Sequence, residues 1–192
     1  PTGTLIAPPT NSICEGYTVA LNASGAFGYQ WYFNNTMLSG AVQSSYIANG
    51  PGLYKVEFSS DKGCKKMSTN FVNLVTIKKP KVSFTNDLYC VNVASSFTNK
   101  SETSNSGSVG YSWRFQNGTV DTNFNVVHVF PRSGNYRVSL TVIPKDCPQL
   151  SDSNVVLVKV DAPPKGISYF PINAMAGKPI SFVARAIGDV YQ

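Results

Sequence analysis

The sequence predicts an all-β protein made of tandem antiparallel β-sandwiches in a rod-like array. The first observation is a strand motif that occurs twice, as Tyr29-Gln30-Trp31-Tyr32-Phe33 and as Tyr111-Ser112-Trp113-Arg114-Phe115. The second is a Gly-x-Tyr-x-Val motif whose tyrosine, Tyr54 or Tyr136, follows the tryptophan by 23 positions in both copies. The third is composition, because only 14% of the residues are charged while Ser, Thr, Asn, Gly, Val and Tyr are abundant. Together these observations indicate an internal duplication of a small β domain.

The first copy consists of short runs in which apolar and polar residues alternate, separated by turn residues. Tyr54, Val56 and Phe58 fall on one face of the run that follows the Asn49-Gly50-Pro51-Gly52 turn. Alternation with this period is the pattern of half-buried strands, and several such strands in a row predict a sandwich. The predicted strands are residues 4–7, 17–23, 29–33, 44–48, 53–59 and 70–77.

The second copy begins after the linker Lys78-Lys79-Pro80-Lys81 and repeats the order of the first. After the second copy, residues 177–184 parallel residues 16–23, so a third copy is expected to begin and to continue beyond residue 192. We therefore predict domains at 1–78 and 79–161, with 162–192 as the beginning of a third, incomplete domain. The predicted strands of the second copy are 82–85, 91–98, 111–115, 126–130, 134–143 and 154–161.

The four cysteines are predicted to form two disulfides, Cys14 with Cys64 and Cys90 with Cys147. Each pair has one member before the second strand and one in the turn after the Gly-x-Tyr strand, and these points are expected to meet at one end of a sandwich. Each bridge would stabilise its domain by roughly 4 kcal/mol on the chain-entropy model. A zinc site is the competing interpretation, but it needs closely spaced ligand pairs such as Cys-x₂-Cys, which the sequence lacks. Disulfides imply an oxidising compartment, so we predict an extracellular or cell-surface protein.

Candidate catalytic residues are scarce. His128 is the only histidine, and it alternates with valines in a predicted strand, where a structural role is favoured over catalysis. The ten acidic residues include no close pair on one element, as paired-carboxylate hydrolysis would need. No phosphate-binding loop, metalloprotease motif or nucleophile elbow occurs. The sequence therefore predicts no enzyme, no catalytic residue, no cofactor and no metal site.

The aromatic residues divide into core and surface candidates. Trp31, Trp113, Tyr54 and Tyr136 are predicted to be core residues of the sandwiches. Tyr32 faces away from Trp31 and is the one aromatic predicted as an exposed contact for a sugar or a protein.

The charge pattern narrows the range of partners. The net charge is +6, but the basic residues are spread along the chain, so solvated loops are favoured over a site for anionic surfaces or glycans. The sequence has no concentrated face of basic and aromatic residues, so it does not predict nucleic-acid binding. No apolar run is long enough to predict a membrane span in this sequence.

The second copy resembles a PKD (polycystic-kidney-disease-type) domain. The stretches Trp113-Arg114-Phe115-Gln116-Asn117-Gly118, His128-Val129-Phe130 and Gly134-Asn135-Tyr136-Arg137-Val138 follow the family pattern Trp-x-Phe-Gly-Asp-Gly, His-x-Tyr/Phe and Gly-x-Tyr-x-Val. Gln116-Asn117 replace the usual Gly-Asp, so the role of that Asp, including cation binding, is not carried over. The third copy resembles another PKD start. The first copy resembles immunoglobulin-like repeats of large bacterial surface proteins, through Cys14-Glu15-Gly16, Tyr29-Gln30-Trp31-Tyr32, Gly52-x-Tyr54 and Gly63-Cys64.

The resemblance implies a non-catalytic structural or adhesive repeat module of a large bacterial surface or secreted protein, such as a gliding-motility adhesin or a cargo of type IX secretion. The implied partners are other domains of the same long chain, surface or secretion-system proteins, or polysaccharide. The alternative is a spacer or glycan-binding module attached to a secreted hydrolase or protease. A third hypothesis is that this segment is captured as a partner or cargo of a secretion or surface complex.

Overall fold

The computed structural model describes residues 1–192 except 88, 105–106, 163–166, 171–176, 178–180 and 185–192. The chain divides into two compact units, the first made of residues 1–81, 102–110 and 142–152 and the second of 82–101, 111–141 and 153–192. Apart from the short 3₁₀ turn η1 (Pro148–Leu150), every named element is a strand, which confirms the all-β prediction. Within the described residues, no helix has the length and apolar character needed to cross a membrane.

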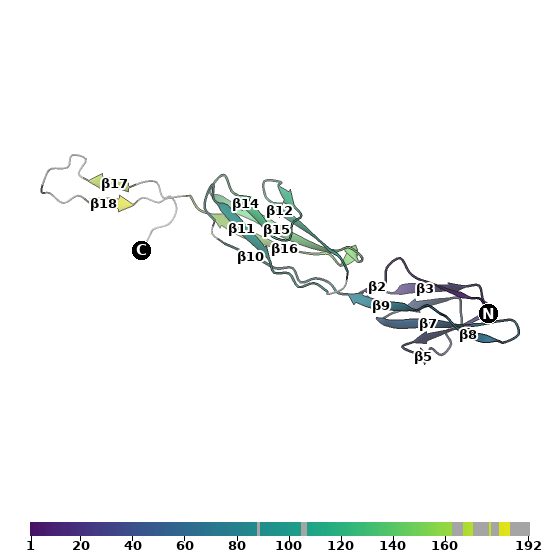
Figure 1. Cartoon of the computed structure of the whole chain (residues 1–192). Coiled ribbons are helices and arrows are strands. Elements are labelled where there is room, and N and C mark those ends of the chain that lie inside the picture. The colour runs from purple at the N-terminus through teal and green to yellow at the C-terminus, as the bar shows by residue number, and fades with distance from the viewer. Residues whose placement is uncertain (88, 105–106, 163–166, 171–176, 178–180, 185–192) are drawn as a thin grey trace. The chain divides into compact units, whose positions relative to one another are not determined.

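Two sheets pack face to face in the first unit. The smaller has the order β1-β3-β6, and the larger has the order β2-β9-β7-β4-β5, with β8 paired to β7. Figure 1 labels β3 of the smaller sheet and β9 and β7 of the larger. Their inward residues form one core, to which Leu5 and Leu21 contribute from the smaller sheet and Trp31, Val56 and Leu74 from the larger. The bounds are β1 Thr4–Ile6, β2 Ser12–Cys14, β3 Val19–Ser24, β4 Gly28–Phe33, β5 Thr36–Met37, β6 Ser45–Ala48, β7 Gly52–Ser59, β8 Lys65–Met67 and β9 Val72–Ile77.

Strand β7 shows why the period-two pattern predicts this fold. Tyr54, Val56 and Phe58 are all at most 2% exposed, whereas the residues between them are half-buried on the other face. Antiparallel pairing with β4 sets Trp31 opposite Val56, so the repeated tryptophan strand lies beside the Gly-x-Tyr strand. The predicted alternation of inward and outward residues in this strand is confirmed.

Strand β2 is a short element that the sequence pattern does not predict. It pairs in parallel with β9, with Ser12 opposite Val75 and Cys14 opposite Ile77. Three residues are too few to display a hydrophobic period, and a parallel partner far along the chain leaves no local turn signal.

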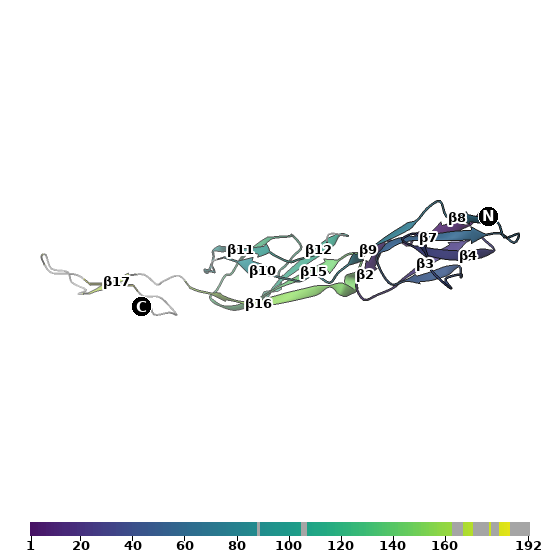
Figure 2. The same cartoon turned by 90° about the horizontal axis from the view of Figure 1, so that it is seen from below.

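The second copy repeats this topology in two further sheets. One has the order β10-β11-β14, matching β1-β3-β6, and the other has the order β13-β12-β15-β16, matching β5-β4-β7-β9. Figure 2 shows β10 and β11 together and the long strand β16. An isolated parallel bridge from Cys90 to Asp161 takes the place of the β2–β9 pairing. The bounds are β10 Phe84–Asn86, β11 Ala94–Asn99, β12 Val109–Phe115, β13 Val120–Asp121, β14 Val126–Val129, β15 Gly134–Pro144 and β16 Asp152–Val160.

The core of the second copy is rich in aromatic side chains. Trp113 and Phe97 are 0% exposed, and their ring centroids lie 6.1 Å apart. Val138, Leu140 and Val142 alternate inward along β15 and are also fully buried.

The predicted third copy falls mostly outside the described residues. Strands β17 (Ile167–Phe170) and β18 (Ser181–Ala184) are described and pair antiparallel. The proposed parallel between residues 177–184 and 16–23 includes residues 178–180, which lie outside the described part.

Candidate functional site

The outer face of the larger sheet in the first unit carries the candidate contact residue Tyr32. We define the Tyr32 face as Gln30, Tyr32, Met37, Lys55, Glu57 and Lys65. Tyr32 lies opposite Lys55 of β7 on one side and Met37 of β5 on the other. Directly paired residues of antiparallel strands project to the same side, so these three side chains share the surface that faces away from Trp31.

The hairpin between β4 and β5 fixes the register of this face. Its two turn residues, Asn34 and Asn35, have φ of 46° and 65°. A two-residue loop with both φ positive matches the twist of the flanking strands, and Asn is among the side chains that tolerate this backbone region. Asn34 Oδ1 also accepts a hydrogen bond from the Leu53 N–H at 2.9 Å, which ties the turn to the start of β7.

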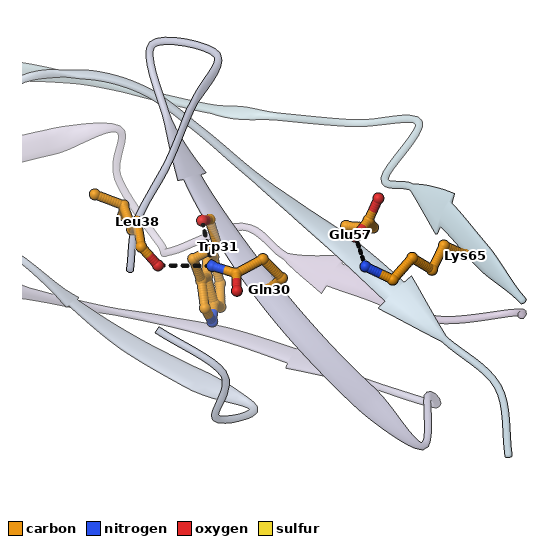
Figure 3. A network of polar contacts seen from close by, with 5 residues as sticks. All are labelled: Gln30, Trp31, Leu38, Glu57 and Lys65. Carbon is orange, nitrogen blue, oxygen red and sulfur yellow. Dashed lines mark hydrogen bonds and ion pairs between the residues drawn. The ribbon is translucent and has the colours of Figure 1, made fainter. Parts of the chain in front are cut away.

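Polar contacts hold four other members of the Tyr32 face in place, and Figure 3 shows three of them, Gln30, Glu57 and Lys65. Gln30 Nε2 donates to the carbonyl oxygens of Leu38 at 2.6 Å and of Trp31 at 3.1 Å. Lys65 Nζ lies 3.0 Å from Glu57 Oε2, and this hydrogen bond, followed by the charge of Glu57, raises the pKa of Lys65. Lys55 Nζ donates to Asn35 Oδ1 at 3.2 Å.

The Tyr32 face carries an aromatic ring and polar groups of the kinds that bind sugars. Tyr32 is half-buried, so part of its ring is open to a planar partner such as a sugar ring. The surrounding amide, ammonium and carboxylate groups can donate to and accept from hydroxyl groups. Glu57 is the one carboxylate in this set, whereas glycoside hydrolysis uses a pair.

The predicted core aromatics take equivalent positions in the two copies. Trp31 Nε1 donates to Gln43 O at 2.9 Å, and Trp113 Nε1 donates to Asn123 O at 3.0 Å. Both tryptophans are 0% exposed, so these hydrogen bonds satisfy donors that burial removes from water.

The two tyrosines each bond to the backbone four residues upstream. Tyr54 Oη donates to Gly50 O at 2.9 Å, and Tyr136 Oη donates to Arg132 O at 2.8 Å. This arrangement is the tyrosine corner of immunoglobulin-type sandwiches. Tyr54 is 2% exposed, whereas Tyr136 is half-buried and packs against Phe130.

Gln116 and Asn117 act as turn-forming amides. Gln116 Oε1 accepts from the Arg137 N–H at 2.9 Å, and Asn117 Oδ1 accepts from the Thr119 N–H at 3.1 Å. Gly118 has φ of 88°, which a glycine adopts without strain. Neutral amides therefore organise this turn. Within the described ranges, no three His, Cys, Asp or Glu residues cluster in a way suited to a metal ion.

His128 lies on β14 and stacks on an aromatic ring. Its ring centroid is 3.9 Å from that of Phe115, with an angle of 9° between the planes. Burial lowers the pKa of His128. Phe130 packs against the edge of the same imidazole at 4.8 Å, so the histidine is part of an aromatic cluster.

Among the described residues, one disulfide is present and joins Cys14 to Cys147, with Cα atoms 5.7 Å apart and a sequence separation of 133. Cys64 and Cys90 are free and exposed. The prediction that Cys14 pairs with Cys64 and Cys90 with Cys147 is therefore wrong, although a disulfide is present.

Strand direction explains why the predicted pairs do not form. Cys14 lies opposite Ile77, beyond the Gly52 end of β7, whereas Cys64 follows the Ser59 end of the same strand. The eight residues of β7 span about 26 Å at roughly 3.3 Å per residue, far more than the ~7 Å that a disulfide allows between Cα atoms. The same holds for Cys90, which bridges to Asp161 after the end of β16, while Cys147 precedes its start.

Polar contacts surround the disulfide within the first unit. Ser12 Oγ donates to Asp146 Oδ2 at 3.2 Å, next to the two bonded cysteines. Lys79 adds an ion pair from its Nζ to Asp152 at 3.3 Å, and its N–H donates to Glu15 Oε2 at 3.2 Å. The disulfide is thus the covalent part of a larger set of contacts between segments distant in sequence.

Sequence reasoning missed the partners of Tyr32 and the true partner of Cys14. Lys55, Glu57 and Gln30 join the Tyr32 face only through the register of β4 against β7. The identical 23-position spacing in both copies was the available signal for that register, because it sets the tryptophan strand beside the Gly-x-Tyr strand. The Cys14–Cys147 link has no comparable local signal.

Residues 78–158 match the PKD domain family. Comparison with curated protein sequences gives no significant match.

Comparison with solved structures finds several other proteins. The I-band fragment I67–I69 from titin aligns with a TM-score of 0.56 and 13% identity, over 84% of this chain and 65% of that chain, which supports the sandwich fold. The PKD1 domain of Vibrio anguillarum Epp aligns with 24% identity and a TM-score of 0.40, over 45% of this chain and 99% of that chain. The fibronectin(III)-like modules of Clostridium thermocellum CbhA align with 14% identity and a TM-score of 0.47, over 84% of this chain and 95% of that chain.

Proposed function

We propose that the chain, whose residues 78–158 match the PKD domain family, serves as a non-catalytic structural repeat module of a large bacterial cell-surface or secreted protein. In this role its sandwiches act as a stalk and an interaction surface for other domains of the same chain. The domains proposed are 1–78, 79–161 and the start of a third at 162–192. An extracellular location fits a disulfide, because disulfides persist in oxidising compartments.

The observation that carries this proposal is the disulfide between Cys14 and Cys147. It closes 133 positions of chain, including most of both copies, into a covalent loop. A link of this kind limits how far the protein extends under tension, which is useful in a spacer.

Pulling single molecules from their two ends tests the proposal. Wild-type protein is expected to reach a final contour length about 480 Å shorter than the Cys14→Ser/Cys147→Ser variant, at roughly 3.6 Å for each of the 133 positions. The matched control is Cys64→Ser/Cys90→Ser, which removes two free thiols and is expected to keep the wild-type length. Equal lengths for wild type and Cys14→Ser/Cys147→Ser would show that the disulfide does not limit extension under tension, which would contradict the proposal.

A glycan-binding accessory module is the second candidate, favoured by the Tyr32 face. The half-buried Tyr32 ring and the nearby Lys55 and Lys65 offer stacking and hydrogen bonding to a polysaccharide. A polysaccharide array with wild type, Tyr32→Ala and the control Tyr17→Ala tests this candidate, since Tyr17 is an exposed tyrosine outside the Tyr32 face. Binding lost only in Tyr32→Ala supports it, and no binding by wild type rejects it.

A further inference from the structure

The free cysteine Cys90 occupies the same structural position as the bonded cysteine Cys14. Cys14 pairs in parallel with Ile77 at the end of β9, and Cys90 forms a parallel bridge with Asp161 directly after β16, the equivalent strand. The residue after each cysteine makes the same hydrogen bond. The Glu15 N–H donates to Ile77 O at 2.9 Å, and the Val91 N–H donates to Asp161 O at 3.1 Å.

The turns that follow these two cysteines also match. The Tyr17 N–H donates to Cys14 O at 2.9 Å, and the Val93 N–H donates to Cys90 O at 3.2 Å. The backbone around Cys90 is therefore built like the backbone that presents Cys14 to its disulfide partner.

The other free cysteine, Cys64, corresponds to the bonded Cys147. Each lies in the turn after its Gly-x-Tyr strand, Cys64 after β7 and Cys147 after β15. The existing bond thus joins the early cysteine of one copy to the late cysteine of the copy that follows it in the chain. By the same pattern, the partner of Cys90 would be a cysteine in the position of Cys64 or Cys147, and the partner of Cys64 would be a cysteine in the position of Cys14 or Cys90. Both free cysteines are exposed.

We propose that Cys90 of one molecule forms a disulfide with Cys64 of a second copy of this chain, in the same head-to-tail sense as Cys14 with Cys147. This inference deepens the proposed role as a repeat module and rests on it, because it names the partner through which modules are linked.

The surroundings of the two cysteines suit this pairing. Cys90 borders a shallow hollow of about 530 Å³ lined by Asp87, Tyr89, Lys159 and Asp161, where a projecting turn has room to enter. Two of these four side chains are acidic and one is basic, with Lys159 Nζ 3.4 Å from Asp161 Oδ1, so the hollow is acidic on balance. The turn that carries Cys64 includes Asp61 and exposed Lys62, whose Oδ2 and Nζ lie 3.9 Å apart, and Lys65 and Lys66 follow it directly, so this turn is basic on balance. Opposite charge near the two thiols favours Cys90–Cys64 encounters over encounters between identical sites.

The reaction is a thiol–disulfide exchange with a small disulfide oxidant such as oxidised glutathione. One thiolate attacks the oxidant and forms a mixed disulfide, releasing one molecule of reduced glutathione. The thiolate of the other protein molecule then attacks the protein sulfur of the mixed disulfide, which forms the Cys90–Cys64 bond and releases the second molecule of reduced glutathione. Two thiols lose two electrons and two protons in total, and the oxidant leaves as two reduced molecules.

Mixing single-cysteine variants of the 192-residue protein tests the proposal. Cys64→Ser keeps Cys90, Cys90→Ser keeps Cys64, and both retain the Cys14–Cys147 disulfide. Incubated with oxidised glutathione, an equimolar mixture is expected to form dimers about tenfold faster than either variant alone, because only the mixture holds the complementary pair. Non-reducing gels measure the rate, and mass spectrometry of peptides identifies the bond.

The expected bond in the mixture joins Cys90 to Cys64. Homodimers that form as fast in either variant alone, or a mixture that stays monomeric, would overturn the proposal. The pulling experiment depends on Cys14 and Cys147 and this one on Cys64 and Cys90, so the failure of either is distinguishable from the failure of the other.

Discussion

At the scale of single residues, His128 lies in the aromatic cluster of the second copy and is expected to make the free energy of unfolding depend on pH. Its imidazole stacks on Phe115 at 3.9 Å and meets Phe130 at 4.8 Å. Desolvation among these rings lowers its pKa below the usual 6.5. The folded state therefore holds this histidine neutral over a range in which the unfolded chain protonates it.

We expect the free energy of unfolding to fall as the pH drops from above 6.5 through the lowered pKa of folded His128. In that window the unfolded state binds more protons, so acid favours unfolding, and the dependence levels off below the folded value. Urea unfolding at pH 7.5 and 5.5 measures this change.

His128→Gln removes the only histidine and is expected to flatten the dependence. The control Val127→Thr changes an exposed neighbour on the same strand and is expected to retain it. An unchanged pH dependence in His128→Gln would assign the effect to other groups.

The residues of the candidate site were only partly predictable. Sequence alternation alone places Tyr32 on the face opposite Trp31, and the structure shows it there, half-buried. Its neighbours Lys55 and Glu57 depend on strand register, which alternation in a single strand does not specify.

At the scale of elements, the glycines that begin β7 and β15 have unusual backbones. Gly52 has φ of 140° and Gly134 has φ of 147°, a region that side chains with a Cβ rarely adopt. The surroundings differ, because a Cβ on Gly52 would lie 2.5 Å from the Phe33 ring, whereas one on Gly134 would have its nearest neighbour, Tyr136, at 3.9 Å.

We expect Gly52→Ala to destabilise the protein more than Gly134→Ala. Backbone strain alone is of order 1–3 kcal/mol in either variant, and the clash with Phe33 adds to it only at position 52. Denaturant unfolding of the two variants measures the difference. Equal losses would show that Phe33 moves aside freely.

The longer strands were predictable because each exposes one face and buries the other over five or more residues. β7 and β15 have this pattern, and both were predicted to within two residues of their observed bounds. Among the two- and three-residue strands, β1 and β10 overlap the predicted segments 4–7 and 82–85. The sequence pattern does not predict β2, β5, β8 and β13, because so short a segment carries no period of its own and is fixed by its partner strand.

At the scale of the whole molecule, the duplication predicted a common topology but not the disulfide partner. Matching offsets identify equivalent positions in the two copies, such as Cys14 with Cys90. They do not reveal that Cys14 bonds to a cysteine in the other copy, because that depends on contacts between segments 133 positions apart.

We expect the Cys14→Ser/Cys147→Ser variant to unfold at a clearly lower temperature than wild type. Closing a loop of 133 positions removes denatured-state entropy worth about 5 kcal/mol at 25 °C on the chain-entropy model. Calorimetry measures the shift. Cys64→Ser/Cys90→Ser is the matched control and is expected to melt at the temperature of wild type whose Cys64 and Cys90 are free thiols. A drop in its melting temperature as large as that of the first variant would argue against the observed pairing.

The parallel pairing of β2 with β9 determines what happens once the disulfide is reduced. While Cys14 and Cys147 are bonded, a pull on the two ends passes through the sulfur atoms and bypasses the strands between them. After reduction, the same pull draws β2 and β9 in opposite directions along their shared axis, because the two strands run parallel. The pairs from Ser12–Val75 to Cys14–Ile77 are then loaded in shear, so their hydrogen bonds yield together instead of opening one at a time. The segment around Cys14 is therefore held by a covalent bond when the disulfide is present, and by β2–β9 hydrogen bonds loaded in shear when it is reduced.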